Sequence, residues 1–133
     1  MNAATFAWIA IGGALGSVAR FAADTLIMRV AGGAFPWGTL AVNAAGSLAI
    51  GVLLALVGPV RPPGPTALQA FVAVGILGGF TTFSAFSGQT LLLAQNQPLQ
   101  AALYVGGTVV LCLAAVWAGY LGAGAWGAVP LAR

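Results

Sequence analysis

Four long apolar stretches, separated by short polar or turn-forming segments, dominate the pattern of this chain. A helix needs about 20 mainly apolar residues to cross the hydrocarbon core of a bilayer. Four segments reach that length, at residues 4–30, 37–57, 66–94 and 99–123. The segments between them carry Gly, Pro, Gln and Asn, which end helices and form turns. The pattern therefore predicts an all-α membrane protein with four transmembrane helices, organised as one domain over residues 1–133.

The scarcity of charge supports this interpretation. The 133 residues are 61% hydrophobic and only 4% charged, whereas a soluble domain carries roughly 25% charged residues. Such a surface requires lipid as its solvent, so the bilayer is an expected partner. The net charge of +3 comes from four scattered arginines. Because they form no basic patch, we expect no nucleic-acid partner.

The residues that most enzymes need are nearly absent. The sequence contains no His, a single cysteine at Cys112 and a single carboxylate at Asp24. Zinc sites, Ser-His-Asp triads and carboxylate pairs all require residues that this chain lacks. We therefore expect that the protein is not an enzyme. The first apolar segment has no basic residue before it, so we interpret it as a transmembrane helix and not a cleaved signal peptide.

The arginines are almost evenly divided between the two sides of the membrane. With four spans, Arg61 and Arg133 fall on one side, and Arg20 and Arg29 lie toward the other. Cytoplasmic loops usually carry an excess of Lys and Arg. A balanced chain can insert in both orientations, and two oppositely inserted copies would pair antiparallel. The alternative is that other signals impose one orientation.

Residues 75–87, in the third apolar segment, are the most informative stretch. The pair Gly78-Gly79 is followed by Thr81 and Thr82, which are poor helix formers. Interrupted backbone at membrane depth is tolerated only where protein buries it or where it lines a wet cavity. Its freed carbonyls can coordinate a hard cation. We predict that the third helix is broken at the glycine pair, near mid-membrane. The alternative is a continuous helix whose Thr hydroxyls bond back to their own backbone.

Aromatic residues share one face of this third helix. Phe80, Phe83 and Phe86 recur at three-residue spacing. Four hydroxyl-bearing residues are interleaved with them: Thr81, Thr82, Ser84 and Ser87. Because an aromatic ring has a positive edge, ring edges and hydroxyls together favour a small anion. The alternative is that the rings only pack in the core or against lipid.

Polar residues also occur inside the first two helices. Asn43 lies about two turns into the second, where a buried amide is costly unless it is hydrogen-bonded. It either joins two helices or offers its NH₂ group to an anion. Arg20 precedes Asp24 by one turn. It either pairs with that carboxylate or gives an aqueous vestibule a positive field that attracts anions.

The remaining motifs are small residues and a polar stripe. Gly12 and Gly16 form a GxxxG pair, and Gly46 and Gly51 lie in the second helix, where small residues let helices approach closely. In the fourth helix, three residues at four-residue spacing share a face: Tyr104, Thr108 and Cys112. That stripe either passes an ion from one group to the next or serves packing.

Together these motifs resemble the CrcB/Fluc family of fluoride channels. Three stretches carry the resemblance: Gly-Gly-x-x-Gly-x-x-x-Arg-Phe in the first helix, Trp-Gly-Thr-Leu-x-Val-Asn-x-x-Gly-Ser in the second, and Gly-Gly-Phe-Thr-Thr-Phe-Ser-x-Phe-Ser in the third. Each alone is weak, but the three occur in order and span nearly the whole chain. Length and number of spans also agree.

The resemblance implies an antiparallel, dual-topology homodimer with two fluoride pores and a structural sodium ion at the dimer interface. It implies that the backbone carbonyls of Gly78 and Thr81 from both subunits hold the sodium. Carbonyl oxygens suit such a hard cation. The implied role is passive export of cytoplasmic fluoride across a bacterial inner (plasma) membrane, which confers fluoride resistance.

The resemblance also assigns residues to the anion path. It implies that seven residues line this path: Asn43, Phe83, Ser84, Phe86, Tyr104, Thr108 and Cys112. Arg20 matches the basic residue of the vestibule. The chain departs from the family pattern at three positions, with Gln89 where many members carry Glu, Ala85 where Thr is frequent, and Cys112 where a hydroxyl residue is common.

Two other functions are compatible with four spans. A small dual-topology multidrug exporter needs a titratable carboxylate in the membrane to couple protons to its substrate. The only such group is Asp24, which lies near a helix end beside Arg20. A non-transporting membrane assembly subunit is the other alternative, and it predicts no ion flux from the purified protein.

Overall fold

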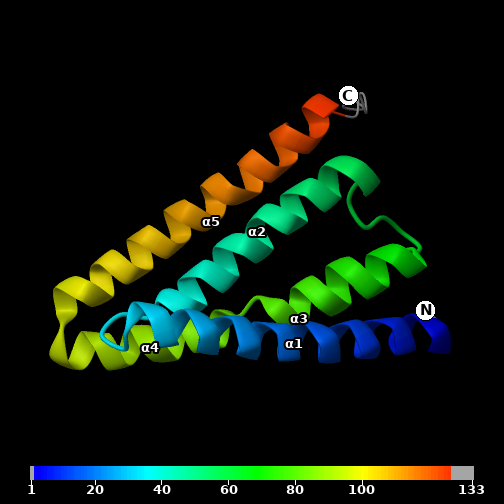
Figure 1. Cartoon of the computed structure of the whole chain (residues 1–133). Helices are drawn as coiled ribbons and strands as arrows, with labels where there is room; N and C mark the ends of the chain where they lie inside the picture. Colours follow the sequence, from blue (N-terminus) through cyan, green and yellow to red (C-terminus); the bar gives the residue numbers. More distant parts are fainter. Residues whose placement is uncertain (1, 127–133) are drawn as a thin grey trace.

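The computed structural model describes residues 2–126, and every regular element in that range is a helix (Figure 1). The elements are α1 (Ala3–Ala31), α2 (Trp37–Val57), η1 (Gln69–Leu77), α3 (Gly78–Phe80), α4 (Phe83–Asn96) and α5 (Pro98–Trp126). Four spans are long and apolar enough to cross a membrane: Ala3–Ala31, Trp37–Val57, Gln69–Asn96 and Pro98–Ala125. The predicted four-span, all-α architecture is therefore confirmed. Arg133 lies outside the described residues.

Local sequence signals begin and end these helices. The Asn2 side chain caps α1 by accepting the Thr5 backbone N–H at 3.0 Å. Gly32 and Gly58 follow α1 and α2 with positive φ values of 81° and 78°, which glycine adopts without steric cost. The loops therefore lie where the breaker residues predict them.

A polar cluster connects the second loop to the third span. Thr66 and Gln69 form a capping box, in which the Gln69 N–H donates to Thr66 Oγ1 at 3.2 Å and the Thr66 N–H donates to Gln69 Oε1 at 3.0 Å. The Gln69 side chain also donates to the carbonyls of Gly58 and Pro59. One buried amide thus anchors the loop to the helix that follows it.

The helices form two layers (Figure 1). In one layer α2 lies along α5, and in the other α1 lies along η1 and α3. Between α3 and α5 the chain runs through α4, which packs against α5. The beginning of α1, the α2–η1 loop and the end of α5 share one end of the bundle, as four successive crossings require (Figure 1).

Glycines bring the helices of each layer into backbone contact. A Cβ atom at Gly12 or Gly16 would collide with the carbonyl oxygens of Phe71 and Ile76, respectively. A Cβ at Gly51 would meet the Val116 carbonyl oxygen across the α2–α5 contact in the same way. The predicted packing role of these small residues is therefore confirmed.

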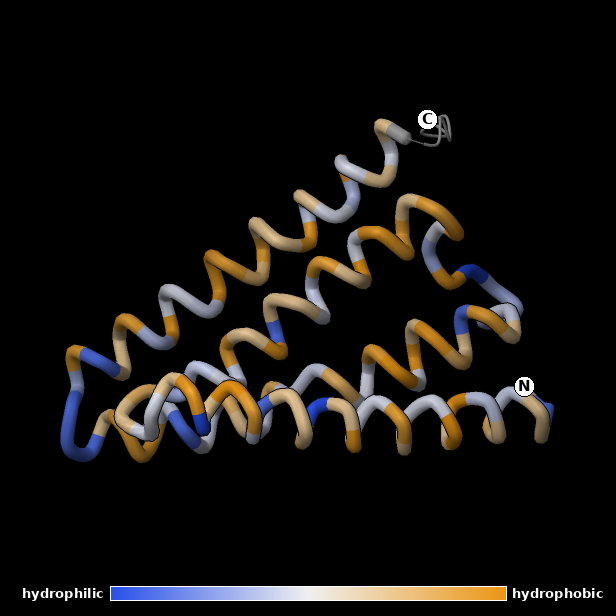
Figure 2. The backbone as a smooth tube through the Cα atoms, viewed as in Figure 1, coloured by the Kyte–Doolittle hydropathy of each residue, from blue (hydrophilic) through white to orange (hydrophobic). Residues whose placement is uncertain are grey.

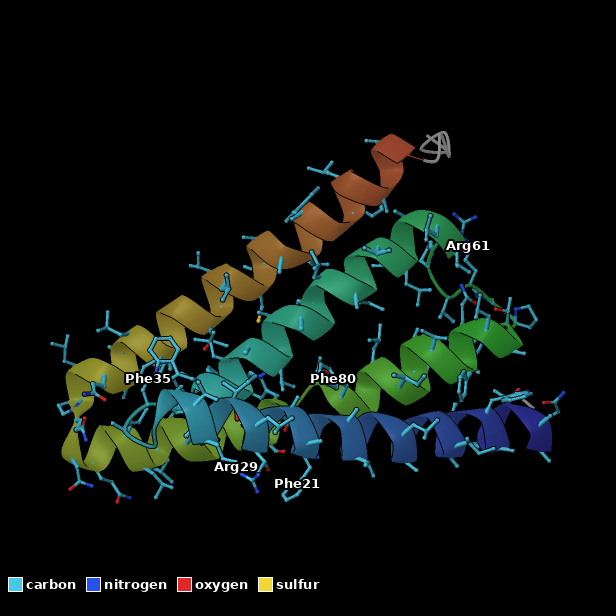
Figure 3. All side chains as sticks on the ribbon, viewed as in Figure 1. Phe21, Arg29, Phe35, Arg61 and Phe80 are labelled. Atoms are coloured by element: carbon cyan, nitrogen blue, oxygen red, sulfur yellow. The ribbon has the colours of Figure 1, made fainter. Side chains whose placement is uncertain are left out.

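Apolar side chains cover the outside of the bundle. Val30 is 91% exposed and Val18 is 70% exposed. Figure 2 shows hydrophobic positions along the length of every span, with hydrophilic positions in the connections and at isolated points within α1 and α2. Arg29 lies in the last turn of α1, and Arg61 lies in the α2–η1 loop (Figure 3). Such a surface is stable only in an apolar solvent, so this is a multi-pass membrane protein.

Candidate functional site

The third span is interrupted, and the interruption lies at Thr81 and Thr82. Thr81 has φ −77° and ψ 156°, and Thr82 has φ −151° and ψ 116°, which are extended conformations. Gly78, with φ −64° and ψ −35°, is helical. The predicted position of the break at Gly78-Gly79 is therefore wrong. A Cβ at Gly79 would collide with the Gly13 carbonyl oxygen, so this glycine serves contact with α1, whereas β-branched threonines suit extended backbone.

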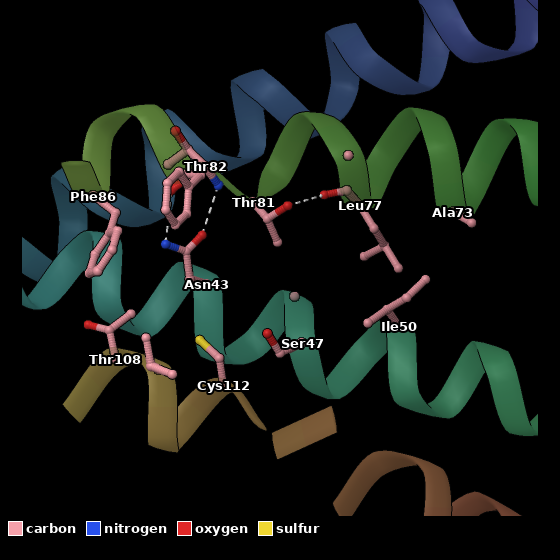
Figure 4. A pocket seen from close by; sticks show the side chains of 14 residues that line it. Asn43, Ser47, Ile50, Ala73, Leu77, Thr81, Thr82, Phe86, Thr108 and Cys112 are labelled. Atoms are coloured by element: carbon pink, nitrogen blue, oxygen red, sulfur yellow. Dashed lines mark hydrogen bonds between the residues drawn. The ribbon is translucent and has the colours of Figure 1, made fainter. Parts of the chain in front are cut away.

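Asn43 of α2 is paired with the interruption by two hydrogen bonds (Figure 4). Its Oδ1 accepts the Thr82 N–H at 2.8 Å, and its Nδ2 donates to the Thr82 carbonyl at 3.1 Å. One turn further along α2, a Cβ at Gly46 would collide with the Thr81 side chain. Asn43 thus joins two helices, as one of its two interpretations predicted, and its second Nδ2 hydrogen takes no part in this pair.

These bonds redirect two donors of the helix. In a continuous α-helix the Thr82 N–H would donate to the Gly78 carbonyl, and the Ala85 N–H would donate to the Thr81 carbonyl. Instead, the Thr82 N–H donates to Asn43, and the Ala85 N–H donates to Thr82 Oγ1 at 3.2 Å. The carbonyls of Gly78 and Thr81 therefore lose their helical partners.

Residues of α1 hold the other side of the interruption. Arg20 Nε donates to the Gly79 carbonyl at 3.3 Å, and Ser17 Oγ donates to the same oxygen at 3.5 Å. Asp24 accepts from the Thr39 hydroxyl at 3.4 Å. The contacts of Arg20 and Asp24 therefore lead to different helices, and the positive charge of Arg20 lies against the end of α3.

A groove of about 420 Å³ opens beside the interruption. Seven predicted site residues line it together: Asn43, Gly78, Thr81, Phe83, Phe86, Thr108 and Cys112. Figure 4 shows the groove between α2, the third span and α5, with Asn43, Phe86 and Thr108 labelled among its lining residues. Three predicted residues are not part of its lining: Arg20, Ser84 and Tyr104. Residues far apart in the sequence are thus brought to one place that carries no formal charge.

The two phenylalanines of the predicted path lie in different surroundings. Their ring centroids are 5.4 Å apart, but Phe83 is 77% exposed whereas Phe86 is 7% exposed. Phe86 packs on Tyr104 with a centroid distance of 5.1 Å. The Tyr104 hydroxyl donates to Gln89 Oε1 at 2.8 Å. The buried ring is therefore held in place, whereas Phe83 faces outward from this single chain.

Thr108 is a buried polar residue of the groove whose hydroxyl has no hydrogen-bond partner within residues 2–126. It is 5% exposed, and its hydroxyl oxygen makes no hydrogen bond within the described part of the chain. A buried hydroxyl without a partner is costly. Because Thr108 lines the groove, this unsatisfied hydroxyl lies at the groove wall, where neighbouring atoms cover it in the single chain.

Comparison with known proteins identifies the family. Residues 7–120 match the model of the family described as CrcB-like protein, Camphor Resistance (CrcB). A protein of Rhodospirillum rubrum named fluoride-specific ion channel FluC is 49% identical over 123 residues, which cover 90% of this chain and 94% of the relative. A protein of the same name from Paracoccus denitrificans is 51% identical over 116 residues, covering 86% and 90%. This chain belongs to the CrcB-like family.

In this CrcB-like protein, sequence reasoning missed part of the groove. Ser47, Ile50 and Thr82 line it but were not among the predicted site residues. A signal for Ser47 was present, because it lies four residues after Asn43 and so shares its helix face. No local signal identified Thr82 as the partner of Asn43, since the two are 39 residues apart.

Proposed function

We propose that this protein is a fluoride-selective channel that lets fluoride leave the cytoplasm passively. The observation that carries the proposal is the groove that gathers Asn43, Phe86 and the unpartnered Thr108 hydroxyl, in a chain whose relatives bear the name of fluoride-specific channels. Channel transport also suits a groove whose lining contains no carboxylate, histidine or lysine to act as acid or base.

The groove offers a small anion several weak donors and no formal charge. The Thr108 hydroxyl, the remaining Nδ2 hydrogen of Asn43 and the positive ring edges of Phe83 and Phe86 replace part of the anion's water shell. Conduction requires binding that is favourable enough for entry and weak enough for release. Neutral donors meet that condition better than an arginine in the groove would.

The functional unit in this proposal is an antiparallel, dual-topology homodimer. Phe83 is 77% exposed and the groove is open in one chain, so a second copy would complete its wall. Arg29 and Arg61 lie toward opposite ends of the bundle, which removes the charge bias that orients most membrane proteins (Figure 3). Thr81 and Thr82 lie midway along the Gln69–Asn96 span, which supports an interruption near mid-membrane.

A structural sodium ion fits the residues at the interruption. The carbonyls of Gly78 and Thr81 have lost their helical donors, and hard cations prefer oxygen ligands. Neutral carbonyls suit a monovalent ion, and Asp24 is not part of the groove. One chain supplies two such oxygens, so two antiparallel copies would supply four. The ion, when bound, would hold the two interrupted helices together at the dimer interface.

The proposed location is the inner membrane of a bacterium, where a fluoride channel has a clear purpose. Hydrogen fluoride is a weak acid that crosses membranes in its neutral form and ionises in a near-neutral cytoplasm. The trapped anion leaves through the channel, assisted by the inside-negative potential, and the cell becomes fluoride-resistant.

Fluoride efflux from liposomes that hold the purified protein tests the proposal. A fluoride electrode records release, potassium with valinomycin carries the counter-charge, and chloride is measured in parallel. We expect rapid fluoride release with little chloride release. A folded protein that releases no fluoride would contradict the proposal and favour an exporter or an assembly subunit.

A further inference from the structure

The interruption of the third span is stabilised by side chains rather than by its own backbone. Thr81 remains attached to the preceding helix, because its N–H and its hydroxyl both donate to the Leu77 carbonyl at 3.0 Å. Thr82 follows as the residue before α4, and both of its backbone groups bond to Asn43. Without these bonds the N–H and the C=O of Thr82 would lie unsatisfied inside an apolar bundle. Because unsatisfied backbone groups are unfavourable in lipid, we expect the helical hydrogen bonds to return.

We propose that Asn43 and Thr82 are the positioning residues of the sodium site. Asn43 takes the donor that would otherwise occupy the Gly78 carbonyl, and the Thr82 hydroxyl takes the donor that would occupy the Thr81 carbonyl. Each acts through hydrogen bonds and touches no ion. The inference rests on the proposed function, and it identifies what presents these two oxygens to the cation.

The neighbouring carbonyls support the same conclusion, because three of them are occupied. The Leu77 carbonyl accepts from Thr81, the Gly79 carbonyl accepts from Arg20 and Ser17, and the Thr82 carbonyl accepts from Asn43. The hydrogen-bond pattern, not residue type, distinguishes the oxygens of Gly78, Phe80 and Thr81 from these neighbours. Of these three residues, only Gly78 and Thr81 line the groove. Side chains of α1 and α2, together with the hydroxyls of Thr81 and Thr82, impose that pattern.

Asn43 has two possible roles, contact with the anion and positioning of Thr82, and they predict different effects on sodium binding. An amide that only met the anion would influence fluoride conduction and leave sodium binding unchanged. An amide that positions Thr82 influences sodium binding first, because loss of its two hydrogen bonds lets the Thr82 N–H return to the Gly78 carbonyl. The affinity for sodium therefore separates the two roles.

The test measures sodium-dependent stability of the full-length protein in detergent. Thermal unfolding is recorded while sodium chloride replaces N-methylglucamine chloride at constant ionic strength, and the sodium concentration of half-maximal stabilisation is compared between variants. Asn43→Leu removes both hydrogen bonds to Thr82, and Thr82→Val removes the hydroxyl but keeps the β-branched shape. Thr82→Ser retains the hydroxyl. Ser87→Ala removes a hydroxyl that donates to the Phe83 carbonyl within α4 and takes no part in the hydrogen bonds of Thr81 and Thr82.

We expect the sodium midpoint to rise about tenfold for Asn43→Leu and about fivefold for Thr82→Val. We expect Thr82→Ser and Ser87→Ala to stay within about twofold of the unmodified protein. A merely structural defect would lower the unfolding temperature at every sodium concentration without moving the midpoint. Unchanged midpoints in both Asn43→Leu and Thr82→Val would overturn the inference.

The remaining outcomes are also decisive. If Asn43→Leu does not fold, the comparison of Thr82→Val with Thr82→Ser tests the inference. The hydroxyl is the only polar side-chain group in which these two variants differ. If the stability of the unmodified protein does not depend on sodium, the sodium site and this inference are both overturned. Fluoride release from liposomes would then still support the channel, so the two failures are distinguishable.

Discussion

The α2–α5 layer and the third span of this protein use the same apolar composition for different purposes. α2 and α5 are uninterrupted helices in which Gly51 and Gly119 bring the two backbones into contact. The third span begins with π-helical geometry over Gln69–Leu77, continues through three residues of α-helix, and is interrupted before α4. The uninterrupted helices α2 and α5 line one side of the groove, and the interrupted span contributes the carbonyl oxygens of Gly78 and Thr81 beside it.

The difference teaches where a membrane protein can place polar backbone. A bilayer requires every backbone group to be satisfied internally, so an irregular segment needs partners from its neighbours. Here α2 supplies Asn43, and α1 supplies Ser17 and Arg20. The irregular span therefore depends on the regular helices for its hydrogen bonds, whereas α2 and α5 depend on each other for close packing.

The largest expected effect comes from breaking the regular layer. Gly51→Ala places a methyl group where the Val116 carbonyl oxygen lies, and overpacking of this kind costs about 1–3 kcal/mol. We expect a clearly lower thermal unfolding temperature in detergent. Gly106→Ala is the control, because nothing lies within 4 Å of a Cβ at that position. Equal destabilisation by both changes would show that the α2–α5 contact is not the cause.

The next effect concerns the ring on the open side of the irregular span. Phe83→Ile keeps an apolar side chain and removes the positive ring edge that we propose for the anion path. We expect fluoride efflux from liposomes to fall about tenfold or more while the protein elutes from a sizing column as before. Efflux equal to that of the unmodified protein would remove this ring from the path.

A smaller effect is expected where the two regions face each other across the groove. Thr108→Val removes a buried hydroxyl that has no partner within the described residues. Because an unsatisfied buried group is unfavourable, we expect the free energy of unfolding to stay equal or to rise by about 1 kcal/mol. We expect fluoride efflux to fall about threefold in the same variant. Thr108→Ser should retain efflux. Lower stability with unchanged efflux would mean that the hydroxyl serves packing.

The smallest effect is expected at the only carboxylate of the chain. Asp24 lines a separate cavity of about 280 Å³ with Gln89 and Asn96, outside the groove. We expect Asp24→Asn to change fluoride efflux by less than about twofold, since a passive channel needs no proton coupling. A proton-coupled exporter would lose its transport in the same variant, so the result separates the two functions.

The sequence by itself determined the solvent, the number of spans and the chemical class of the site. Apolar length and charge scarcity depend only on composition and order, so a bilayer and four helices follow from them directly. The composition also lacks histidine and contains a single acidic residue, so His-based triads and carboxylate pairs are missing. Asn43, Phe83 and Phe86 were identified from the same local patterns, and the groove brings them together.

Only the tertiary structure decided where the third span is interrupted and which oxygens are left free. Helix propensity predicted the break at Gly78-Gly79, yet Gly79 is helical and packs against Gly13 of α1. The interruption lies at Thr81 and Thr82, and Asn43 satisfies the backbone groups of Thr82. A local pattern indicates how readily a residue adopts a non-helical conformation. It does not identify Asn43, 39 residues away, as the hydrogen-bond partner of Thr82. In lipid those distant partners determine where the helix is interrupted, because no water is present there to hydrogen-bond an unpaired backbone group.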